Sequence, residues 1–160
     1  MPLFGRKHQD ATQAETEPDD PMGQNRVFYS RENGIVTYWY LAHRCEEECY
    51  RAQRYERPLA LLIVRPAPES GGLAPRHQLA ATLRTALRAA DVAAYSRSEY
   101  IILLPETNEE QAEELATRLR AEVPNTVTGL SAFPEDGADL AILTEVARKQ
   151  LPAADVQAAA

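Results

Sequence analysis

The amino-acid sequence predicts an α/β fold, an α+β sandwich in which helices flank a central sheet, and three observations lead to this prediction. Several segments repeat apolar residues at the helical spacing of three to four. Short apolar runs with the length of buried strands lie between them. Turn-forming glycine and proline residues separate the two kinds of segment. The order helix, strand, helix, hairpin, helix, strand, helix predicts a central mixed sheet that contains antiparallel pairs.

The first half of this pattern contains two helices and one strand. Residues 37–56 form the first predicted helix, with a buried stripe of Tyr38, Leu41, Cys45, Cys49 and Ala52. The run RPLALLIVR, residues 57–65, is almost continuously apolar, which is typical of a strand covered on both faces. A turn-rich connection leads to a second predicted helix, residues 76–90, with an apolar stripe of Leu79, Leu83, Leu87 and Ala90.

The second half begins with a hairpin. Residues 91–96 and 99–105 have the composition of two strands joined by a tight turn. Thr107 to Glu110 fits a capping box that opens a third helix, with a buried stripe of Ala112, Leu115, Leu119 and Val123. Residues 125–133 form the last predicted strand, and the final helix follows on Leu140, Leu143, Val146 and Ala147.

Charge and composition exclude several classes of function. A net charge of −7 and a pI near 5.0 provide no basic field for a nucleic acid. No apolar run reaches the roughly 20 residues that cross a bilayer, and the N-terminus lacks the apolar core of a signal peptide. We therefore expect a cytoplasmic protein that binds neither nucleic acid nor membrane. We expect a disordered tail at residues 1–25, one domain at 26–151 and a flexible tail at 152–160.

The two cysteines, Cys45 and Cys49, lie four residues apart and therefore on one face of the first predicted helix. Zinc would need further ligands, and the nearest, His43, lies on another side of that helix. Buried free cysteine packs as a small hydrophobic residue, and a reducing compartment disfavours a disulfide. We expect two core-facing thiols, no metal site and no cofactor.

Together with the element order, the amino-acid sequence of several segments resembles that of the GGDEF (diguanylate cyclase) domain over about residues 30–151. The resemblance implies the nucleotidyl-cyclase-like fold, with an antiparallel signature hairpin. Gly129 and the loop FPEDG, residues 133–137, also match the family pattern. The four matching segments are RCEEECYRAQRYERPLALLIV, LRAADVAAYSRSEYIILLPET, EEQAEELATRLRAEV and TVTGLSAFPEDGAD.

The resemblance also implies an active site, and the sequence departs from it. Family members condense two GTP molecules into cyclic di-GMP with two metal ions held by carboxylates. The first strand should close with a metal-binding aspartate, but Arg65 stands there. We interpret the remaining acid of the signature hairpin as a solvated strand residue. The signature Gly-Gly-Asp/Glu-Glu-Phe corresponds, in a turn one residue shorter, to Ser96, Arg97, Ser98, Glu99 and Tyr100.

Further parts of the nucleotide site are altered. The loop that reads guanine in the family is reduced to RPAPESGGLAP and lacks its Asn and Asp. The first-helix motif becomes SRENGIVTYW and keeps Gly34 and the aliphatic Ile35 alone, and the closing Lys and Arg segment is absent. We therefore expect a degenerate, catalytically inactive GGDEF-like domain.

One family motif is unchanged. Arg88-Ala89-Ala90-Asp91 matches the R-x-x-D motif, which forms an inhibitory cyclic di-GMP site in many GGDEF domains, and Arg118 matches a further arginine of that site. Arginine can grip phosphate or guanine with a planar fork, and aspartate accepts from guanine. A structural role is the alternative: Arg88 is expected in the last turn of its helix, where the helix dipole favours a cation, and Asp91 caps a turn into the strand.

These observations leave several functions open. The first is a regulatory domain that acts as a cyclic di-GMP receptor through Arg88, Asp91 and Arg118. The second is an interaction or scaffold module without nucleotide; the protein partner and homodimer formation stay undetermined. An active cyclase is the least supported. The interaction module rests on an aromatic cluster of Phe28, Tyr29, Tyr38, Trp39 and Tyr40.

Overall fold

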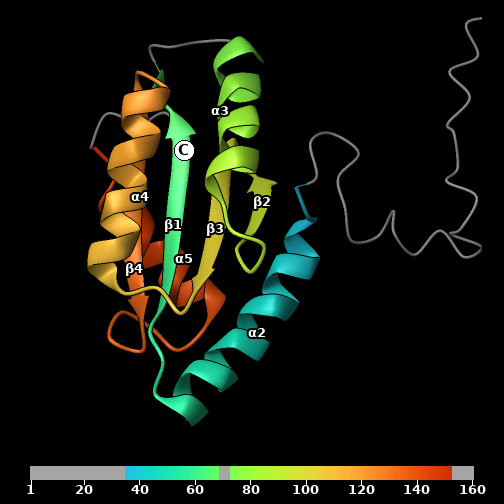
Figure 1. Cartoon of the computed structure of the whole chain (residues 1–160), viewed down its shortest axis with the longest axis vertical. Coiled ribbons are helices and arrows are strands. Elements are labelled where there is room, and N and C mark those ends of the chain that lie inside the picture. Colours follow the sequence, from blue (N-terminus) through green and yellow to red (C-terminus); the bar gives the residue numbers. More distant parts are fainter. Residues whose placement is uncertain (1–34, 69–72, 153–160) are drawn as a thin grey trace, which may run out of the picture.

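The computed structural model describes residues 35–68 and 73–152. The predicted tail at residues 1–25 and, apart from residue 152, the predicted tail at residues 152–160 lie outside the described residues, as do Gly34, Phe28 and Tyr29. Most of the reduced loop RPAPESGGLAP is described, except residues 69–72. The element order is the predicted one: helix, strand, helix, hairpin, helix, strand and helix (Figure 1).

A four-stranded sheet forms the centre of the domain, in the order β2-β3-β1-β4. All three ladders are antiparallel, with Leu61 opposite Leu103 in β3 and Ser131 in β4. Among the described residues, the parallel component of the predicted mixed sheet is limited to one isolated bridge, between Val36 and Ala94. The strands are β1 (Leu59–Pro66), β2 (Val92–Ser96), β3 (Glu99–Pro105) and β4 (Thr126–Phe133).

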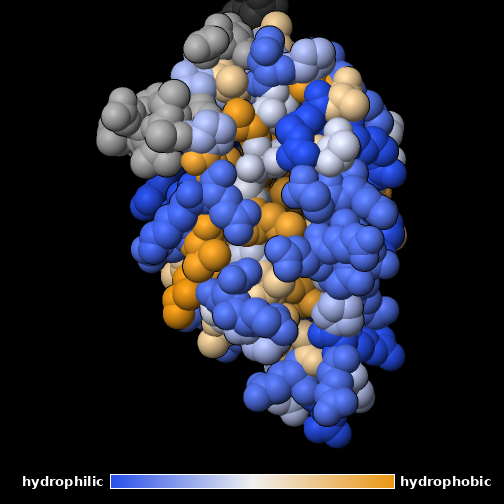
Figure 2. Space-filling view, turned by 90° about the vertical axis from the view of Figure 1, so that its left-hand side faces the viewer, coloured by the Kyte–Doolittle hydropathy of each residue, from blue (hydrophilic) through white to orange (hydrophobic). Residues whose placement is uncertain are grey.

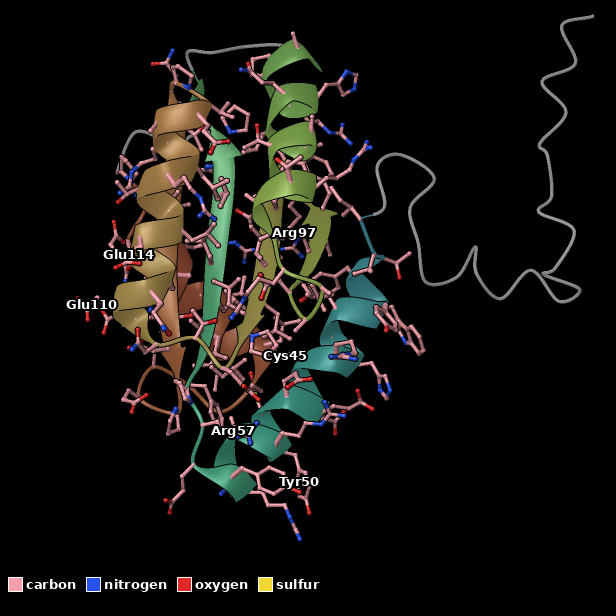
Figure 3. All side chains as sticks on the ribbon, in the orientation of Figure 1. Cys45, Tyr50, Arg57, Arg97, Glu110 and Glu114 are labelled. Atoms are coloured by element: carbon pink, nitrogen blue, oxygen red, sulfur yellow. The ribbon has the colours of Figure 1, made fainter. Side chains whose placement is uncertain are left out.

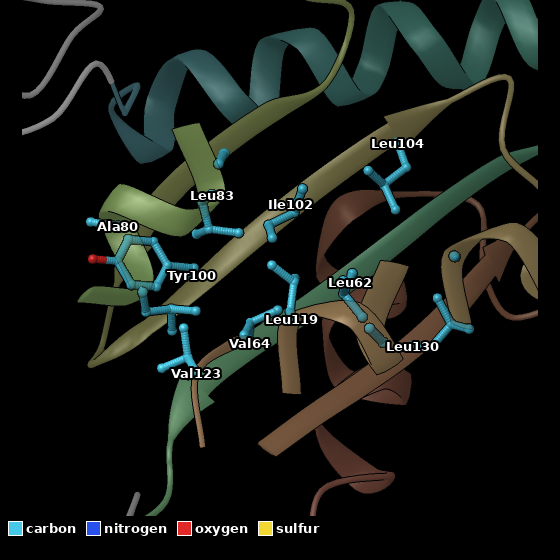
Figure 4. Close-up of a cluster of buried hydrophobic side chains, with 14 of the residues drawn as sticks. Leu62, Val64, Ala80, Leu83, Tyr100, Ile102, Leu104, Leu119, Val123 and Leu130 are labelled. Carbon is cyan, nitrogen blue, oxygen red and sulfur yellow. The ribbon is translucent and has the colours of Figure 1, made fainter. Parts of the chain in front are cut away.

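Helices cover both faces of the sheet, which confirms the predicted fold class. Helices α3 (Leu73–Ala86) and α4 (Glu109–Glu122) lie on one face, and α2 (Tyr38–Tyr55) and α5 (Leu140–Lys149) on the other (Figure 1). Alternate residues of β1 serve the two faces: Leu62 and Val64 face α3 and α4, and Leu61 and Ile63 face α2 and α5. The core under α3 and α4 includes Tyr100, which lies at the edge of the cluster drawn in Figure 4.

Helix α2 begins after Thr37, whose side chain accepts a hydrogen bond from the Tyr40 amide, and ends at Glu56 with left-handed backbone. Cys45 and Cys49 are buried against the sheet, as predicted, with their sulfur atoms 3.9 Å apart. The hydrogen bond with Cys49 and burial together raise the pKa of the Cys45 thiol. Tyr38 was predicted to be buried and is instead exposed, because it lies in the first turn and borders a groove beside α5.

Helix α3 is shorter than predicted. It ends at Ala86, and residues 87–91 form a loop in which Leu87 is half-buried and Ala90 is exposed. The Asp91 amide donates to the Arg88 carbonyl at 3.0 Å, which closes a turn instead of a further helical turn. The prediction that Arg88 lies in the last turn of the helix is therefore wrong.

Helix α4 has a capping box, but one residue later than predicted. Asn108 is the N-cap: its side chain accepts from the Gln111 amide, and the Gln111 side chain accepts from the Asn108 amide. Thr107 is turned inward and is buried. Its hydroxyl donates to the Pro105 carbonyl, so tertiary contacts take this side chain away from capping.

Helix α5 packs directly on strand β4. A Cβ atom at Gly129 would lie 1.9 Å from the Ala147 carbonyl oxygen, so any larger residue would push the helix off the strand. Two polar contacts fix the helix further: the Ser131 hydroxyl donates to the Leu143 carbonyl, and the Gln150 side chain accepts from the Leu130 amide.

On the face that Figure 2 shows, most side chains are hydrophilic, with one visible exception. On the side that carries α4, β4 and α5, hydrophobic side chains form a strip bordered by hydrophilic ones (Figure 2). Glu110 and Glu114 project outward from α4 (Figure 3). Among the helices that the structure describes, none combines the length and apolarity needed to cross a membrane.

Candidate functional site

The turn between β2 and β3 holds the altered signature positions. Ser96 pairs with Glu99, so Arg97 and Ser98 alone make the turn. Both have left-handed backbone, with φ of 52° and 66°. Two consecutive positive φ angles characterise the type I′ turn, which matches the twist of a two-residue hairpin. The short turn predicted from the sequence is present, and it adopts positive φ without the glycines that usually allow it.

Tyr100, at the signature phenylalanine position, is buried under α3. Its hydroxyl donates to the Arg76 carbonyl at 3.2 Å. The rings of Tyr95 and Tyr100 lie 4.9 Å apart, and the Arg76 guanidinium carbon lies 3.8 Å from the centre of the Tyr95 ring. These contacts hold the hairpin rigidly against α3.

Glu99 is buried, not solvated, which corrects the interpretation from the sequence. Its side chain is 2% exposed and accepts from Arg148 of α5. The Arg148 Nε atom lies 2.7 Å from Glu99 Oε1, and Arg148 Nη2 donates to the same oxygen. The retained carboxylate of the signature, that of Glu99, is therefore already paired with a cation of the same chain, Arg148.

Arg65 lies at the end of β1, opposite Val127 of β4. The residue is 6% exposed, and its Nε and Nη2 atoms are buried without a hydrogen-bond partner within residues 35–68 and 73–152. The hairpin end of the sheet thus combines two arginines with one glutamate. Nowhere in the described part of the chain do three or more His, Cys, Asp or Glu side chains gather as a metal site would require.

Arg88 and Asp91 lie at the opposite end of the sheet, and the structure brings them together. Arg88 Nη2 lies 3.2 Å from Asp91 Oδ1, and the Arg88 amide donates to Asp91 Oδ2 at 2.8 Å. The same Nη2 donates to the Pro105 carbonyl at 3.0 Å and to the Thr107 hydroxyl at 2.6 Å. The Asp91 side chain is 3% exposed, whereas that of Arg88 is 58% exposed. The pair ties the loop after α3 to the end of β3.

Arg118 does not join this pair. Its Nη2 atom donates to the Ala86 carbonyl at the end of α3, at 3.3 Å. Ala86 precedes Arg88 by two residues, so Arg118 reaches the neighbourhood of the motif from α4 without a direct contact to Arg88 or Asp91. The predicted convergence of three side chains is therefore only partly realised in this structure.

A cavity of about 490 Å³ adjoins Arg88 and Asp91. Arg44 of α2 and Arg84 of α3 share its wall, and Arg118 is not in that wall. Small-molecule sites commonly have volumes of roughly 300–1,000 Å³. Sequence reasoning missed both arginines. The spacing of four between Arg84 and Arg88 is a signal for Arg84, whereas Arg44 is brought to the cavity only by the packing of α2 beside β2.

A second, larger hollow of about 1480 Å³ runs between α2 and the loop that joins β4 to α5. Tyr38 and Tyr50 border it, and Arg57 is its basic residue among the described residues of the lining. Tyr50 and Arg57 lie toward the projecting end of α2 (Figure 3). Its acidic lining residues are Glu46, Glu56, Glu109, Glu135, Asp136 and Asp139.

Comparison with known proteins supports the fold because solved structures resemble it, whereas the comparisons of sequence find no match. No model of a protein family matches the chain, and no curated protein matches it. The fold resembles that of a sensory box/GGDEF family protein from Caulobacter crescentus, with a TM-score of 0.64 and 23% identity over 74% of this chain and 92% of the other.

Two further structures agree. The GGDEF domain of TpbB (YfiN) from Pseudomonas aeruginosa has a TM-score of 0.64 and 18% identity, covering 75% of this chain and 84% of that one. The coiled coil and GGDEF domain of DgcB from Caulobacter crescentus, a complex with cyclic di-GMP, has a TM-score of 0.70 and 10% identity, covering 79% of each chain. The described chain has the fold of the GGDEF domains.

Proposed function

We propose that this chain is a catalytically inactive GGDEF-like regulatory domain that binds cyclic di-GMP beside Arg88 and Asp91. Inactivity is supported at the hairpin end, where Arg65 occupies the expected position of a metal-binding carboxylate and Glu99 is bound by Arg148. Two-metal phosphoryl chemistry requires carboxylates that are free to coordinate. Incubation with GTP and Mg²⁺ or Mn²⁺ tests this part: we expect no cyclic di-GMP, and its formation would contradict the proposal.

The observation that carries the receptor proposal is the cavity shared by Arg44, Arg84 and Arg88. Three cationic side chains around one hollow suit a ligand with phosphate groups and guanine edges, because arginine donates two parallel hydrogen bonds to either. Arg88 is the arginine of the retained motif, and its half-exposed side chain is anchored through both Nη2 and Nε. Anchoring lowers the entropic cost of presenting a guanidinium to a ligand.

Arg118 has a secondary role in the proposed binding of cyclic di-GMP. Its guanidinium reaches from α4 to the end of α3, beside the loop that carries Arg88, and lies outside the cavity wall. Cyclic di-GMP has two guanines and two phosphates, so it is large enough to extend beyond a single arginine side chain. Arg118 therefore contacts cyclic di-GMP only if the ligand extends across the end of α3.

Calorimetric titration with cyclic di-GMP tests the receptor proposal. We expect saturable binding by the full chain, weakened at least tenfold in Arg84→Ala and in Arg88→Ala, which corresponds to about 1.4 kcal/mol each. Arg54→Ala is the matched control, because Arg54 is an exposed arginine on α2 and lies outside the cavity wall. Absence of heat at high micromolar ligand, or unchanged affinity in both variants, sinks the receptor proposal. Far-UV circular dichroism and urea unfolding check that Arg88→Ala is folded.

The large hollow beside α2 favours a second candidate, a protein-interaction module without nucleotide. Trp39, Tyr50 and Tyr55 are exposed on α2, which is unusual for large aromatic side chains away from an interface. Since the charged residues of the lining are mostly acidic, a cationic amphipathic helix is the partner that its charge suits. The same charge disfavours homodimer formation through this surface.

Fluorescence anisotropy separates the two candidates. A labelled Lys/Leu amphipathic peptide should bind, and a Glu/Leu peptide of the same length should not. Tyr50→Ser together with Glu46→Lys should weaken the binding at least tenfold, whereas cyclic di-GMP affinity should be unchanged. Equal binding of both peptides would count against an interaction surface at this place.

A further inference from the structure

The large hollow beside α2 combines an apolar wall with an acidic rim. Its wall includes four residues that are buried in the core, Ala52, Leu59, Phe133 and Leu140. Arg57, the basic residue of the described lining, is already paired with Glu106. Apolar contact and unpaired carboxylates together suit a short segment that is both apolar and cationic. Four glutamates of the lining are exposed, and none of them forms an ion pair with another described residue: Glu46, Glu56, Glu109 and Glu135.

The chain carries such a segment near the beginning of its sequence. Residues 1–8 read MPLFGRKH, so Leu3 and Phe4 closely precede Arg6 and Lys7. The first acidic residue is Asp10, which leaves this short segment cationic although the whole chain has a net charge of −7. The segment lies outside the described residues. Its composition is the complement of the wall and the rim of the large hollow.

Most of the rim carboxylates gather at the C-terminal end of α2. Glu56 caps that end of the helix. Leu59, at the start of β1, pairs with the last residues of β3 and β4. Glu109 and Glu135, which follow these two strands in the sequence, therefore lie at the same end of the sheet. This end is about 27 Å from the start of α2, because the helix has 18 residues that rise about 1.5 Å each.

Chain length decides which cationic residues can reach this end of α2. Residues 9–34, which are 26 residues, separate His8 from Ile35, where the described part of the chain begins. Even at the dimensions of a random coil, 26 residues cover about 30 Å, which matches the length of α2. A tether of matching length keeps its end near a site at an effective concentration on the order of millimolar. Arg31 is four residues from Ile35 and reaches about 14 Å at most, so it cannot contact this part of the rim.

We propose that residues 3–8 of the chain dock in the large hollow. Leu3 and Phe4 pack against its apolar wall, and Arg6 and Lys7 lie beside the rim carboxylates at the C-terminal end of α2. This inference rests on the interaction surface proposed above and names its occupant as a segment of the same chain. A docked segment excludes a cationic partner helix, so an external partner binds only by displacing it.

Paramagnetic relaxation in the full chain tests the docking. A spin label attached to Gln9→Cys is specific for that position, because the two natural thiols are buried. In ¹⁵N-labelled protein the label should broaden the amide resonances of Glu109 and Glu135 and leave those of α3, on the other face of the sheet, unchanged. Arg6→Glu together with Lys7→Glu should remove the broadening. Uniform broadening, or the same broadening in this double variant, overturns the proposal.

Variants of the rim test the same contact from the other side. Glu109→Lys with Glu135→Lys should also remove the broadening, because like charges then face the segment. The matched control is Glu110→Lys with Glu114→Lys, which makes the same change of charge at two residues of α4 outside the lining (Figure 3). This control should keep the broadening, and its loss in both pairs of variants overturns the proposed site. Far-UV circular dichroism checks that all variants are folded.

Competition with the labelled Lys/Leu peptide separates this inference from the interaction surface on which it rests. Arg6→Glu with Lys7→Glu should bind the peptide at least threefold more tightly than the unaltered chain, because the internal competitor is lost. Arg26→Glu with Arg31→Glu makes the same change of charge and should leave the affinity unchanged. Equal tightening in this control overturns the assignment to residues 3–8.

Two further outcomes of the competition are distinguishable. Peptide binding with the same affinity in the unaltered chain and in the variant of Arg6 and Lys7 overturns the docking and leaves the interaction surface standing. Absence of peptide binding to every form, with the broadening intact, removes the external partner and supports residues 3–8 as the occupant of the large hollow.

Discussion

The two ends of the central sheet treat arginine in opposite ways. At the end formed by the α3–β2 loop and the end of β3, Arg88 has partners in Asp91, Pro105 and Thr107. At the hairpin end, Arg148 is paired with Glu99, and Arg65 is buried with two unpartnered donors among the described residues. The motif that matches its family is thus internally satisfied, whereas Arg65 at an altered position is not.

This difference shows that a match to a family motif and the capacity to bind a ligand are separate properties of a residue. A retained motif can owe its contacts to the fold, as the bonds from Arg88 to main-chain and side-chain acceptors indicate. An altered position can carry an unbalanced charge, as Arg65 does among the described residues. The following variants probe the two ends, from the largest expected effect to the smallest.

The buried ion pair at the hairpin end should give the largest effect. Glu99→Gln removes the carboxylate and leaves Arg148 and the buried Arg65 without an anion, so we expect a loss of about 3 kcal/mol in the free energy of unfolding. Arg148→Met should cost less, because Arg65 remains beside Glu99 to oppose its charge. Urea denaturation at constant ionic strength measures both, and a larger loss in Arg148→Met would contradict the arrangement of charges described above.

The opposite end should respond to loss of its acceptor. Asp91→Ala removes the partner of the Arg88 amide and guanidinium from a side chain that is 3% exposed, and we expect a loss of about 2 kcal/mol in the free energy of unfolding. Asp136 provides a matched control on β4–α5, since it also accepts from a main-chain amide, that of Ala132, but has no arginine partner there. Asp136→Ala should cost about 1 kcal/mol.

Replacing the unpartnered arginine should have the opposite sign. Arg65→Met removes a buried charge and should raise the free energy of unfolding by about 1 kcal/mol, since apolar replacement of buried ionic groups is often stabilising. Arg88→Met should lower it, because Asp91 and Thr107 lose their donor. Equal losses in the two variants, measured by thermal and urea unfolding, would remove the difference between the two ends.

The turn should give the smallest effect. Ser98 has φ of 66°, which costs an L-residue about 1–2 kcal/mol, whereas the glycine that replaces it pays a similar but smaller entropic penalty of about 0.5–1 kcal/mol. Ser98→Gly should therefore stabilise the chain by about 0.5 kcal/mol. Ser96→Gly, two residues earlier at the end of β2, should destabilise it by a similar amount. Unfolding of both variants in parallel checks the sign.

The sequence by itself determined the element order, the fold class and most of the core. The reason is the spacing of apolar residues. Leu41, Leu79 and Leu119 each belong to a stripe that repeats at helical spacing, and the run from Leu59 to Val64 is apolar throughout. Length also determined the tight hairpin, because only two residues lie between Ser96 and Glu99. It placed Arg65 at the end of a buried strand and Arg88 three residues before Asp91.

Tertiary structure alone decided what these side chains contact. The sequence could not show that Glu99 is buried, because its partner Arg148 is 49 residues away and reaches it only when α5 packs on Gly129. It could not predict that the N-cap is Asn108 and not Thr107, because Arg88 binds Thr107 at the end of the sheet that both residues share. Local spacing specifies elements, whereas partners over long separations depend on how those elements pack. The charge left on Arg65 emerges only from that packing.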